Sequence, residues 1–283
     1  MNYLQMFIAK INDDFPTLPT IYSSLLEVMS NPRSTVTDVA NIISQDQSSS
    51  VKILKSVNSS IYGLKVKVET ISEAIFHIGF NEVKNLVASL SIIKIFATTV
   101  NTPKFTLVDL WKHSIAVGVI TRLLGKLIGS KNIENYFLSG IVHDIGKLFF
   151  LKEFSVEYSK VVLLALEKEI PIRLAEREVF GTTHMVIGDL IAEKWRLPVS
   201  IRNTIKHHSL GIAGSNIDTQ IAIVHLANII GRVMGLGYAG DNLIPEPNLG
   251  TWDILNLPPR TLSGLMPTIN SDFEQSVSIL LVN

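Results

Sequence analysis

The sequence contains no cysteine, so disulfide bonds and thiolate metal sites are excluded along all 283 residues. Any metal site must therefore use histidine, aspartate, glutamate, asparagine or water as ligands. The sequence also has no excess of charge, because 25 lysine and arginine residues balance 25 aspartate and glutamate residues. Without a net field of one sign, we expect neither nucleic acid nor an anionic membrane surface as a partner.

Long apolar runs are missing as well, although 47% of the residues are hydrophobic and the mean hydropathy is +0.32. A membrane span needs about 18 consecutive apolar residues. The best candidate, LVASLSIIKIFA at 86–97, is shorter and contains Lys94. The N-terminal segment does not resemble a signal peptide, since Leu4, Phe7 and Ile11 follow helical spacing. We therefore expect a cytoplasmic protein that does not contact a membrane.

Sustained alternation of apolar and polar residues is absent too, and the apolar periodicity is helical almost throughout. This pattern predicts an all-α protein. Pro103, in the polar stretch TTVNTP, is the expected boundary between subdomains. The predicted organisation is an N-terminal helical subdomain over residues 1–103, a helical core over 104–240, and a loop with a short helical tail over 241–283. Helices are expected near 49–58, 71–78, 81–97, 106–129, 133–151, 155–170, 172–180, 183–196, 199–208 and 218–235.

Polar side chains nevertheless interrupt the apolar helices, most clearly at IVHDIGKLFF, residues 141–150. A buried polar group is costly unless it is paired or bound to a metal. On a helix, His143 and Asp144 lie about 100° apart, so both can reach one site between helices. Lys147 lies one turn after His143 on the same face. An ordered series of other histidines supplies candidate partners for these residues: His113, His184, His207 and His208.

This set of side chains matches metal-assisted hydrolysis of a phosphoester. Imidazole suits Fe, Zn, Mn or Ni, and a carboxylate such as Asp144 can bridge two metal ions. The ammonium of Lys147 would lie where a phosphate oxygen binds, while the metals activate a water molecule. The alternative is purely structural, because a lone histidine on an apolar helix more often hydrogen-bonds within the core. That alternative predicts a metal-free protein.

The order H…HD…H…HH resembles that of the HD metal-dependent phosphohydrolases, and HDIGK is the spelling found in HD-GYP cyclic di-GMP phosphodiesterases. A more specific resemblance, to HDOD proteins, a regulatory branch of this superfamily, covers about residues 15–235. It rests on the segments LPTIYSSLLEVMSNP, IISQDQSSSVKILKSVNSSIYG, ISEAIFHIGFNEVKNLV, LWKHSIAVG and HMVIGDLIAEKWRLP. The resemblance implies an N-terminal helical subdomain packed on an HD-type helical core.

The resemblance also implies roles for individual residues. Asp144 is the expected bridging carboxylate, and Asp144 and Lys147 are the residues expected to act if the site is catalytic. Asn228 stands where the superfamily closes its pattern with aspartate. Asp109 could add a carboxylate to the site, although we favour a role at the start of its helix beside Thr106. The expected ligands of a divalent metal centre, mononuclear or binuclear, are His113, His143, Asp144, His184, His207 and His208, with Asn228 and Asp109 as additional candidates.

Two departures from the HD-GYP pattern argue against catalysis. Asn228 is neutral, and HHSLGIAGS lacks the acidic residue and the DGxGYP loop that follow the paired histidines in those enzymes. We interpret GLGYAGD at 235–241 as a chance match in a Gly-rich turn. The resemblance therefore implies a regulatory protein that retains an HD-type metal site and acts mainly through a signalling protein partner. The retained histidines favour the alternative, an active phosphohydrolase or phosphodiesterase whose ligand is cyclic di-GMP or another nucleotide or phosphoester.

Overall fold

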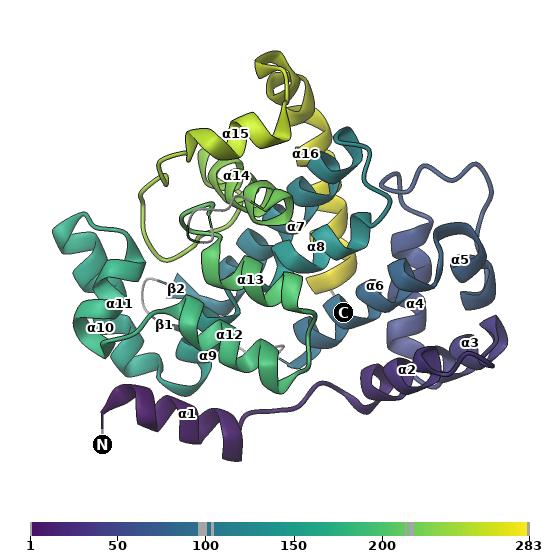
Figure 1. Ribbon diagram of the computed structural model, residues 1–283, viewed down its shortest axis with the longest axis horizontal. Coiled ribbons are helices and arrows are strands. Elements are labelled where there is room, and N and C mark those ends of the chain that lie inside the picture. The colour runs from purple at the N-terminus through teal and green to yellow at the C-terminus, as the bar shows by residue number, and fades with distance from the viewer. Residues whose placement is uncertain (1, 96–100, 103–104, 213, 215–217, 282–283) are drawn as a thin grey trace.

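The structure, a computed structural model, describes residues 2–95, 101–102, 105–212, 214 and 218–281. Within these ranges the chain is helical apart from one short antiparallel ladder, which joins β1 (Asn101–Thr102) to β2 (Phe105–Thr106) (Figure 1). The prediction of an all-α protein is confirmed. Pro103, the expected boundary between subdomains, lies outside the described residues. No helix of the described ranges is both long and apolar enough to span a membrane.

The N-terminal half is a group of helices around a shared apolar core, on the right of Figure 1. Leu25, Ile43, Ile53 and Val83 are completely buried in it. The helices of this half are α2 (Thr20–Ser30), α3 (Val36–Ser44), α4 (Gln47–Val57), α5 (Ile71–Ile78) and α6 (Phe80–Ile95). Several begin at a side chain that accepts a backbone hydrogen bond, as Thr35 and Thr70 do for α3 and α5. These caps explain why the helices begin where they do.

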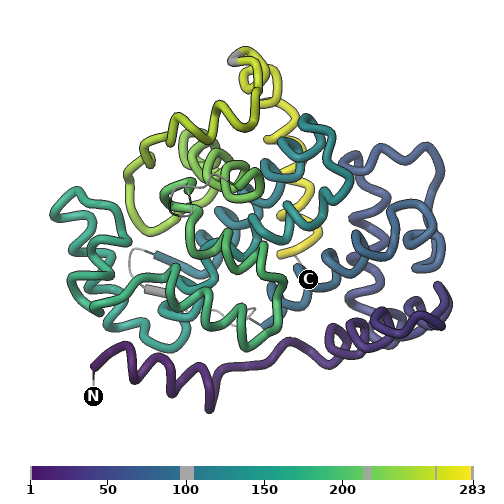
Figure 2. Tube along the Cα trace, in the orientation of Figure 1, coloured from purple at the N-terminus to yellow at the C-terminus, as the bar shows by residue number. Residues whose placement is uncertain are grey.

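The first helix, α1 (Tyr3–Asp13), lies away from that group, and Figure 2 shows the chain running from it to α2 along one edge of the molecule. Phe7 of α1 packs edge-on against Phe149, Phe150 and Phe180 of the second half. Lys194 of α12 (His184–Lys194) donates hydrogen bonds to the carbonyls of Asn12, in the last turn of α1, and of Phe15, just after it. Aromatic packing and these bonds therefore attach the N-terminal helix to the helices that follow residue 140.

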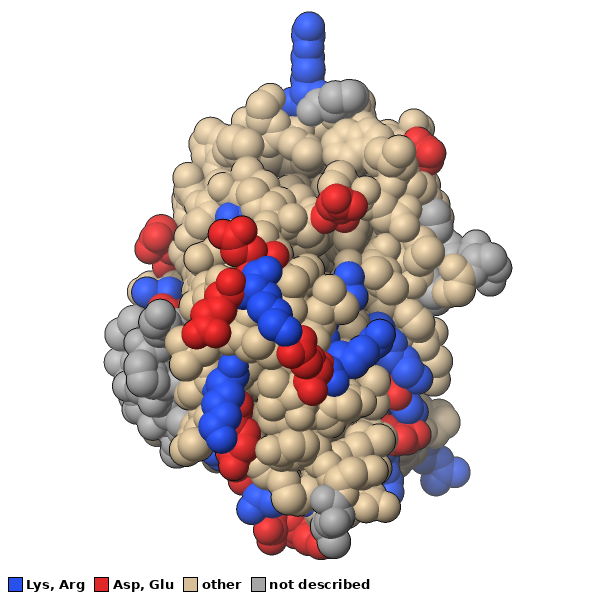
Figure 3. All heavy atoms as spheres, turned by 90° about the vertical axis from the view of Figure 1, so that its left-hand side faces the viewer, with Lys and Arg blue, Asp and Glu red and all other residues tan. Residues whose placement is uncertain are grey.

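The second half is built around α7 (Leu107–Leu127), which is buried along most of its length and contacts α8 (Ile133–Val142) and α14 (Thr219–Val233). The two helices α7 and α8 touch at backbone distance, because a methyl group on Gly140 would lie 2.5 Å from the Cα of Gly118. The remaining helices of this half are α9 (Ile145–Glu153), α10 (Ser155–Lys168), α11 (Ile172–Phe180) and α13 (Val199–His207). On the face at the left of Figure 1, acidic and basic side chains are interleaved (Figure 3).

The C-terminal segment is more regular than the short tail that the sequence predicts. It contains α15 (Leu249–Leu255) and α16 (Pro259–Leu281), a helix of 23 residues with Pro267 inside it. Pro267 and Gly264 weaken the helical signal in the sequence. Packing against α7, α4 and α6 compensates, so α16 bridges the two halves of the chain. Lys52 of α4 donates to the carbonyl of Leu280 at 3.2 Å.

A buried charged network also joins the two halves. Arg122 of α7 pairs with Glu134 of α8 through two contacts of 2.7 Å, and its guanidinium stacks 3.9 Å from the ring centroid of Phe137. Glu82 of α6 accepts a hydrogen bond of 2.6 Å from the backbone N–H of Glu134. Glu82 therefore caps α8 from the N-terminal half, and the other end of α8 leads directly into His143 and Asp144.

This cap has a consequence for the pH dependence of stability. Burial raises the pKa of Glu82 from 4.5 to about 7. Because folded Glu82 holds its proton more tightly than unfolded Glu82, its contribution to the free energy of unfolding falls as the pH rises from about 4.5 to 7. We expect Glu82→Gln to remove this loss and to stabilise the protein by about 1–2 kcal/mol at pH 8, with little effect at pH 4.5.

Urea unfolding at the two pH values measures the effect, and Glu167→Gln, at an exposed position of α10, is the matched control. An equal shift at both pH values, or the same pH-dependent shift in the control, would contradict this assignment.

Candidate metal centre

Three helices and the turn between two others bring the predicted polar residues to one buried point. His113 lies on α7, His184 is the first residue of α12, and His208 directly follows α13. The continuous helix expected over 133–151 is interrupted: α8 ends at Val142 and α9 begins at Ile145. His143 and Asp144 form the turn between these two helices, where the carbonyl of Asp144 accepts from the N–H of Lys147 at 2.8 Å. The turn aims both side chains into the space between α7, α12 and α13.

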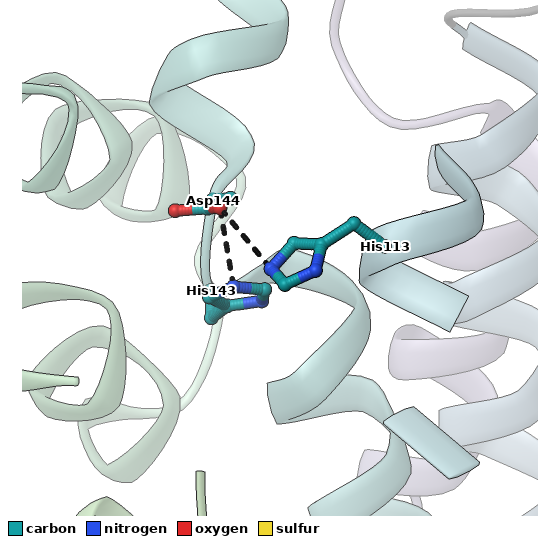
Figure 4. Close-up of side chains that lie close together, drawn as sticks. All are labelled: His113, His143 and Asp144. Carbon is teal, nitrogen blue, oxygen red and sulfur yellow. Dashed lines mark ion pairs between the residues drawn. The ribbon is translucent and has the colours of Figure 1, made fainter. Parts of the chain in front are cut away.

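The side chains form two groups of potential metal ligands that share one carboxylate. In the first group, Oδ2 of Asp144 lies 3.2 Å from Nε2 of His143 and 3.8 Å from Nε2 of His113 (Figure 4). In the second, Oδ1 of Asp144 lies 3.3 Å from Nε2 of His184 and 3.4 Å from Nε2 of His208. Each carboxylate oxygen thus faces a different pair of imidazoles, the arrangement of a ligand that bridges two cations.

Several histidine nitrogens and one carboxylate oxygen at this point have lone pairs that no described protein group uses. Carbonyl oxygens accept from Nδ1 of His143 (Gly140, 2.7 Å) and of His208 (Ile205, 2.9 Å), so the lone pair of each ring lies on Nε2. Nε2 of His208 has the Ser209 hydroxyl oxygen 3.3 Å away. Nε2 of His113, His143 and His184 and Oδ1 of Asp144 are buried without a hydrogen-bond partner among the described residues. Buried acceptors normally have partners, so these atoms fit a bound divalent cation.

The electrostatics keep the same groups in the state that binds a cation. Burial holds the pKa of His113 well below its usual range and lowers that of His208 to about 3, so both imidazoles are neutral at pH 7. Burial raises the pKa of Asp144, but the neighbouring His143 and Lys147 more than offset this and hold it well below its usual range. Neutral His113 and His208 beside an ionised Asp144 are donors of the kind that divalent transition metals prefer.

Lys147 is the cation that the centre already contains. Its side chain is only 2% exposed, and its ammonium donates to Oδ2 of Asp144 at 2.7 Å and to the carbonyl of Ala239 at 3.1 Å. A buried charge requires such partners, because an unpaired ammonium is very costly. Lys147 therefore neutralises the bridging carboxylate and connects the centre to the segment that follows α14.

Several predicted residues are not brought into the two groups. The His207 side chain is partly exposed and lies near Lys206 and Asp189, because consecutive residues at the end of α13 point in different directions. Asp109 accepts the Thr106 hydroxyl proton at 2.6 Å and its N–H donates to Oγ1 of Thr106 at 3.1 Å, a role at the helix start.

The closing helix of the pattern, α14, contributes one amide and one structural histidine. Asn228 is 4% exposed, and its Oδ1 is buried without a hydrogen-bond partner within the described ranges. Asn228 lines the same cavity as His184 and His208. His225 uses both ring nitrogens elsewhere: Nδ1 donates to the carbonyl of His208 at 2.8 Å, and Nε2 accepts from the N–H of Asn248 at 3.1 Å.

A cavity of about 550 Å³ opens onto the second ligand group. Its walls include Lys147, Arg232 and Arg173 and the segment from Leu243 to Asn248. Sequence reasoning did not connect this segment to the site. GLGYAGD, interpreted as a Gly-rich turn, begins the same connection: Tyr238 donates its N–H to the carbonyl of Asp109 at 3.1 Å. Its Asp241 pairs with Arg232 at 2.7 Å and caps the N-terminus of α11 through the N–H of Ile172.

Glu176 is a second residue that sequence reasoning missed. It is completely buried on α11, and its Oε2 accepts from Nδ1 of His184 at 2.7 Å and from the backbone N–H of His184 at 2.8 Å. The other oxygen, Oε1, accepts the hydroxyl proton of Tyr158 at 2.8 Å. A carboxylate behind a histidine fixes the ring orientation and raises its basicity as a ligand. The only signal in the sequence is a glutamate eight residues before a histidine, and only the folded chain shows that the two side chains are in contact.

Replacing Glu176 tests this contact. We expect Glu176→Gln to weaken binding of Zn²⁺ or Mn²⁺ by about 10- to 100-fold, because a neutral amide is a weaker acceptor than a carboxylate and no longer raises the basicity of the His184 ring. Calorimetric titration of the apoprotein measures the affinity. Tyr158→Phe is the control, since it removes one hydroxyl and leaves the contact between Glu176 and His184 intact. Equal affinities in wild type and Glu176→Gln would show that Glu176 has no part in orienting the ligand.

The fold and this centre define a helical protein with an HD-type cluster of histidines around a shared aspartate. The chain belongs to the HDOD domain family, whose model matches residues 15–210. A crystal structure of an HDOD domain protein of unknown function from Geobacter sulfurreducens has a TM-score of 0.77 at 23% identity and covers 99% of this chain and 100% of its own. A "Putative metal-dependent phosphohydrolase" from Shewanella amazonensis SB2B has a TM-score of 0.66 at 23% identity, covering 97% and 99%.

A third structure, a "Putative signal transduction protein" from Marinobacter aquaeolei VT8, has a TM-score of 0.75 at 17% identity and covers 98% of this chain and 64% of its own. An uncharacterized protein of Treponema pallidum (strain Nichols) is 28% identical over 269 residues, 94% of this chain and 51% of that protein. The uncharacterized protein YuxH of Bacillus subtilis (strain 168) is 31% identical over 127 residues, 45% of this chain and 30% of its own. The chain thus spans about half or less of the length of these curated relatives.

Proposed function

We propose that this HDOD chain is a regulatory module that holds two divalent cations at Asp144 and acts through a signalling protein partner. The observation that carries the metal part is the sharing of one buried carboxylate by two ligand groups, His113 with His143 and His184 with His208. Fe, Mn, Ni and Zn all suit this donor set. The "Putative signal transduction protein" of the same fold is in keeping with the regulatory part.

The contacts of the cationic residues favour regulation over catalysis. Lys147 is held by Asp144 and Ala239, and Arg232 is held by Asp241, so neither cation is free to bind a phosphoryl group. The closing ligand position carries Asn228, which supplies an oxygen but no charge. A centre with one carboxylate fewer binds a second cation less tightly, which suits a metal-dependent structural state better than steady turnover.

The second candidate function is hydrolysis of a phosphoester such as cyclic di-GMP, and the cavity favours it. The cavity of about 550 Å³ is large enough for a nucleotide-sized ligand and is lined by His184, His208 and Lys147. Bound divalent cations would polarise a phosphoryl oxygen and activate a water molecule there. Within the chain, His184 and His208 would hold the cation nearest the cavity, and Lys147 would bind a phosphate oxygen after leaving Asp144.

A hydrolysis screen separates the two candidates. Apoprotein reconstituted with Mn²⁺, Fe²⁺ or Ni²⁺ is incubated with cyclic di-GMP and bis(p-nitrophenyl) phosphate, with Asp144→Asn as the inactive reference. The regulatory proposal predicts no turnover above that reference. Turnover by wild type that Asp144→Asn abolishes would establish the hydrolase instead. Asn228→Asp is the informative variant, because a gain of turnover in it alone would show that the neutral amide is what prevents catalysis.

A further inference from the structure

A groove on the N-terminal half has the composition of a peptide-binding surface. It measures about 630 Å³, lies between α4 and residues 64–69, and is on the side of the molecule away from α11 and α12 (Figure 1). Val51, Leu54, Leu64 and Val66 supply its apolar surface. Val66 is 55% exposed and Val51 is 44% exposed, which is unusual for adjacent aliphatic residues of a soluble fold.

The rim of this groove is positively charged. Lys55, Lys65 and Lys67 line it, whereas one acidic residue, Glu69, does so. Lys67 and Glu69 form an ion pair of 3.1 Å in which both side chains are mostly exposed. Lys55 and Lys65 make no ion pair with any described residue, so their charges face solvent. The groove therefore combines apolar contacts with a local excess of positive charge, although the chain as a whole has no net charge.

The groove is held in shape by one side chain. Asn58, at the end of α4, accepts from the N–H of Val68 at 2.8 Å and donates to the carbonyl of Val68 at 2.7 Å. It also donates to the carbonyl of Leu54 at 2.9 Å. These bonds fix Val68 beside the end of α4. A groove wall that is fixed in advance loses little conformational entropy when it binds a partner.

We propose that this groove docks an acidic segment of a partner protein. Its apolar side chains would lie on Val51, Leu54 and Val66, and its carboxylates would face Lys55, Lys65 and Lys67. A nucleic acid would leave the apolar walls unmatched, and no aromatic residue lines the groove for stacking on a base. This inference rests on the proposed function only for the existence of a protein partner, and it does not depend on the metal centre.

Fluorescence anisotropy with labelled ten-residue peptides tests the proposal on the full chain. One peptide alternates Asp and Glu with Leu and Val, a second replaces the acids with Ser and Gln, and a third replaces the apolar residues with Ser. We expect the first peptide to bind about tenfold or more tightly than the other two, because both apolar and charged contacts contribute. Equal binding of all three, or no binding of the first, would overturn the proposal.

Variants of the groove provide the second half of the test. Val66→Asp and Lys65→Glu should each weaken binding of the first peptide by about tenfold, and both positions are exposed, so folding is preserved. Val156→Asp and Lys160→Glu make the same changes at exposed positions of α10 and should bind like wild type. Unchanged binding by Val66→Asp would contradict the assignment. If wild type, but not Val66→Asp, bound phosphatidylglycerol vesicles and not the peptide, the groove would be a membrane-binding surface and the proposal of a protein partner would be wrong.

The metal content of each variant is measured in parallel. Because the groove and the metal centre share no residue, Val66→Asp should retain the metal content of wild type. Loss of peptide binding with the metal retained then concerns the groove alone. Peptide binding by a chain that takes up no metal would support the groove and contradict the proposed metal centre.

Discussion

Asp144→Asn is expected to weaken metal binding at both ligand groups by about 100-fold or more. The carboxylate is the one ligand that the two groups share, and its replacement leaves only neutral donors beside the Lys147 ammonium. Calorimetric titration of the apoprotein with Zn²⁺ or Mn²⁺ should detect binding at least about 100-fold weaker than in wild type. Retention of wild-type affinity would contradict the assignment of Asp144 as the bridging ligand.

The same substitution also leaves Lys147 buried without an anion, and removing one partner of a buried pair costs about 3–5 kcal/mol. Loss of metal by unfolding must therefore be separated from loss of a ligand. The double variant Asp144→Asn with Lys147→Met removes the orphaned charge and should recover most of the free energy of unfolding. We expect it still to bind no metal. Recovery of both stability and metal binding would show that the carboxylate is not a ligand.

Gly146→Ala is expected to destabilise the protein by about 3 kcal/mol or more, a large effect for a single methyl group. A methyl group on Gly146 would lie 2.0 Å from the carbonyl oxygen of His184 and 2.7 Å from its carbonyl carbon. The obstacle is backbone, so α9 and α12 must separate. Because His184 begins α12, the separation should also weaken metal binding. Urea unfolding and metal titration measure the two effects.

The matched control is Gly264→Ala. Gly264 lies on α16, and an added methyl group there would meet no atom within 4 Å. Alanine in an exposed helix is more favourable than glycine by about 0.5–1 kcal/mol, so this variant should be neutral or slightly more stable. Similar destabilisation in both variants would show that close contact between α9 and α12 is not what requires glycine at position 146.

Helical periodicity and the order of the histidines were sufficient to predict the fold class and most of the residues that gather at the centre. His113, Asp144 and His184 each stand among apolar residues in the sequence, at positions expected to be buried. A polar residue at a position that must be buried indicates a partner even when the partner lies 70 residues away. The HDOD resemblance then supplied the arrangement of the helices.

The features that the sequence did not reveal depend on three-dimensional contacts without a local pattern. The break between α8 and α9 leaves the apolar periodicity intact, so the sequence predicts one helix over residues 133–151. His207 and His208 are equivalent in the sequence, and only the direction of α13 selects His208. Glu176 and Asp241 resemble ordinary surface acids until α11 and the segment after α14 fold over the centre.

The most direct test of the proposed metal centre is an anomalous difference map from crystals of the full chain reconstituted with Mn²⁺ or Zn²⁺. We expect two peaks on either side of Asp144, one facing His113 and His143 and the other facing His184 and His208. A weaker second peak would agree with the neutral Asn228. A map with no peak at Asp144, from protein that is folded and exposed to excess metal, would contradict the proposal that these side chains form a divalent metal centre.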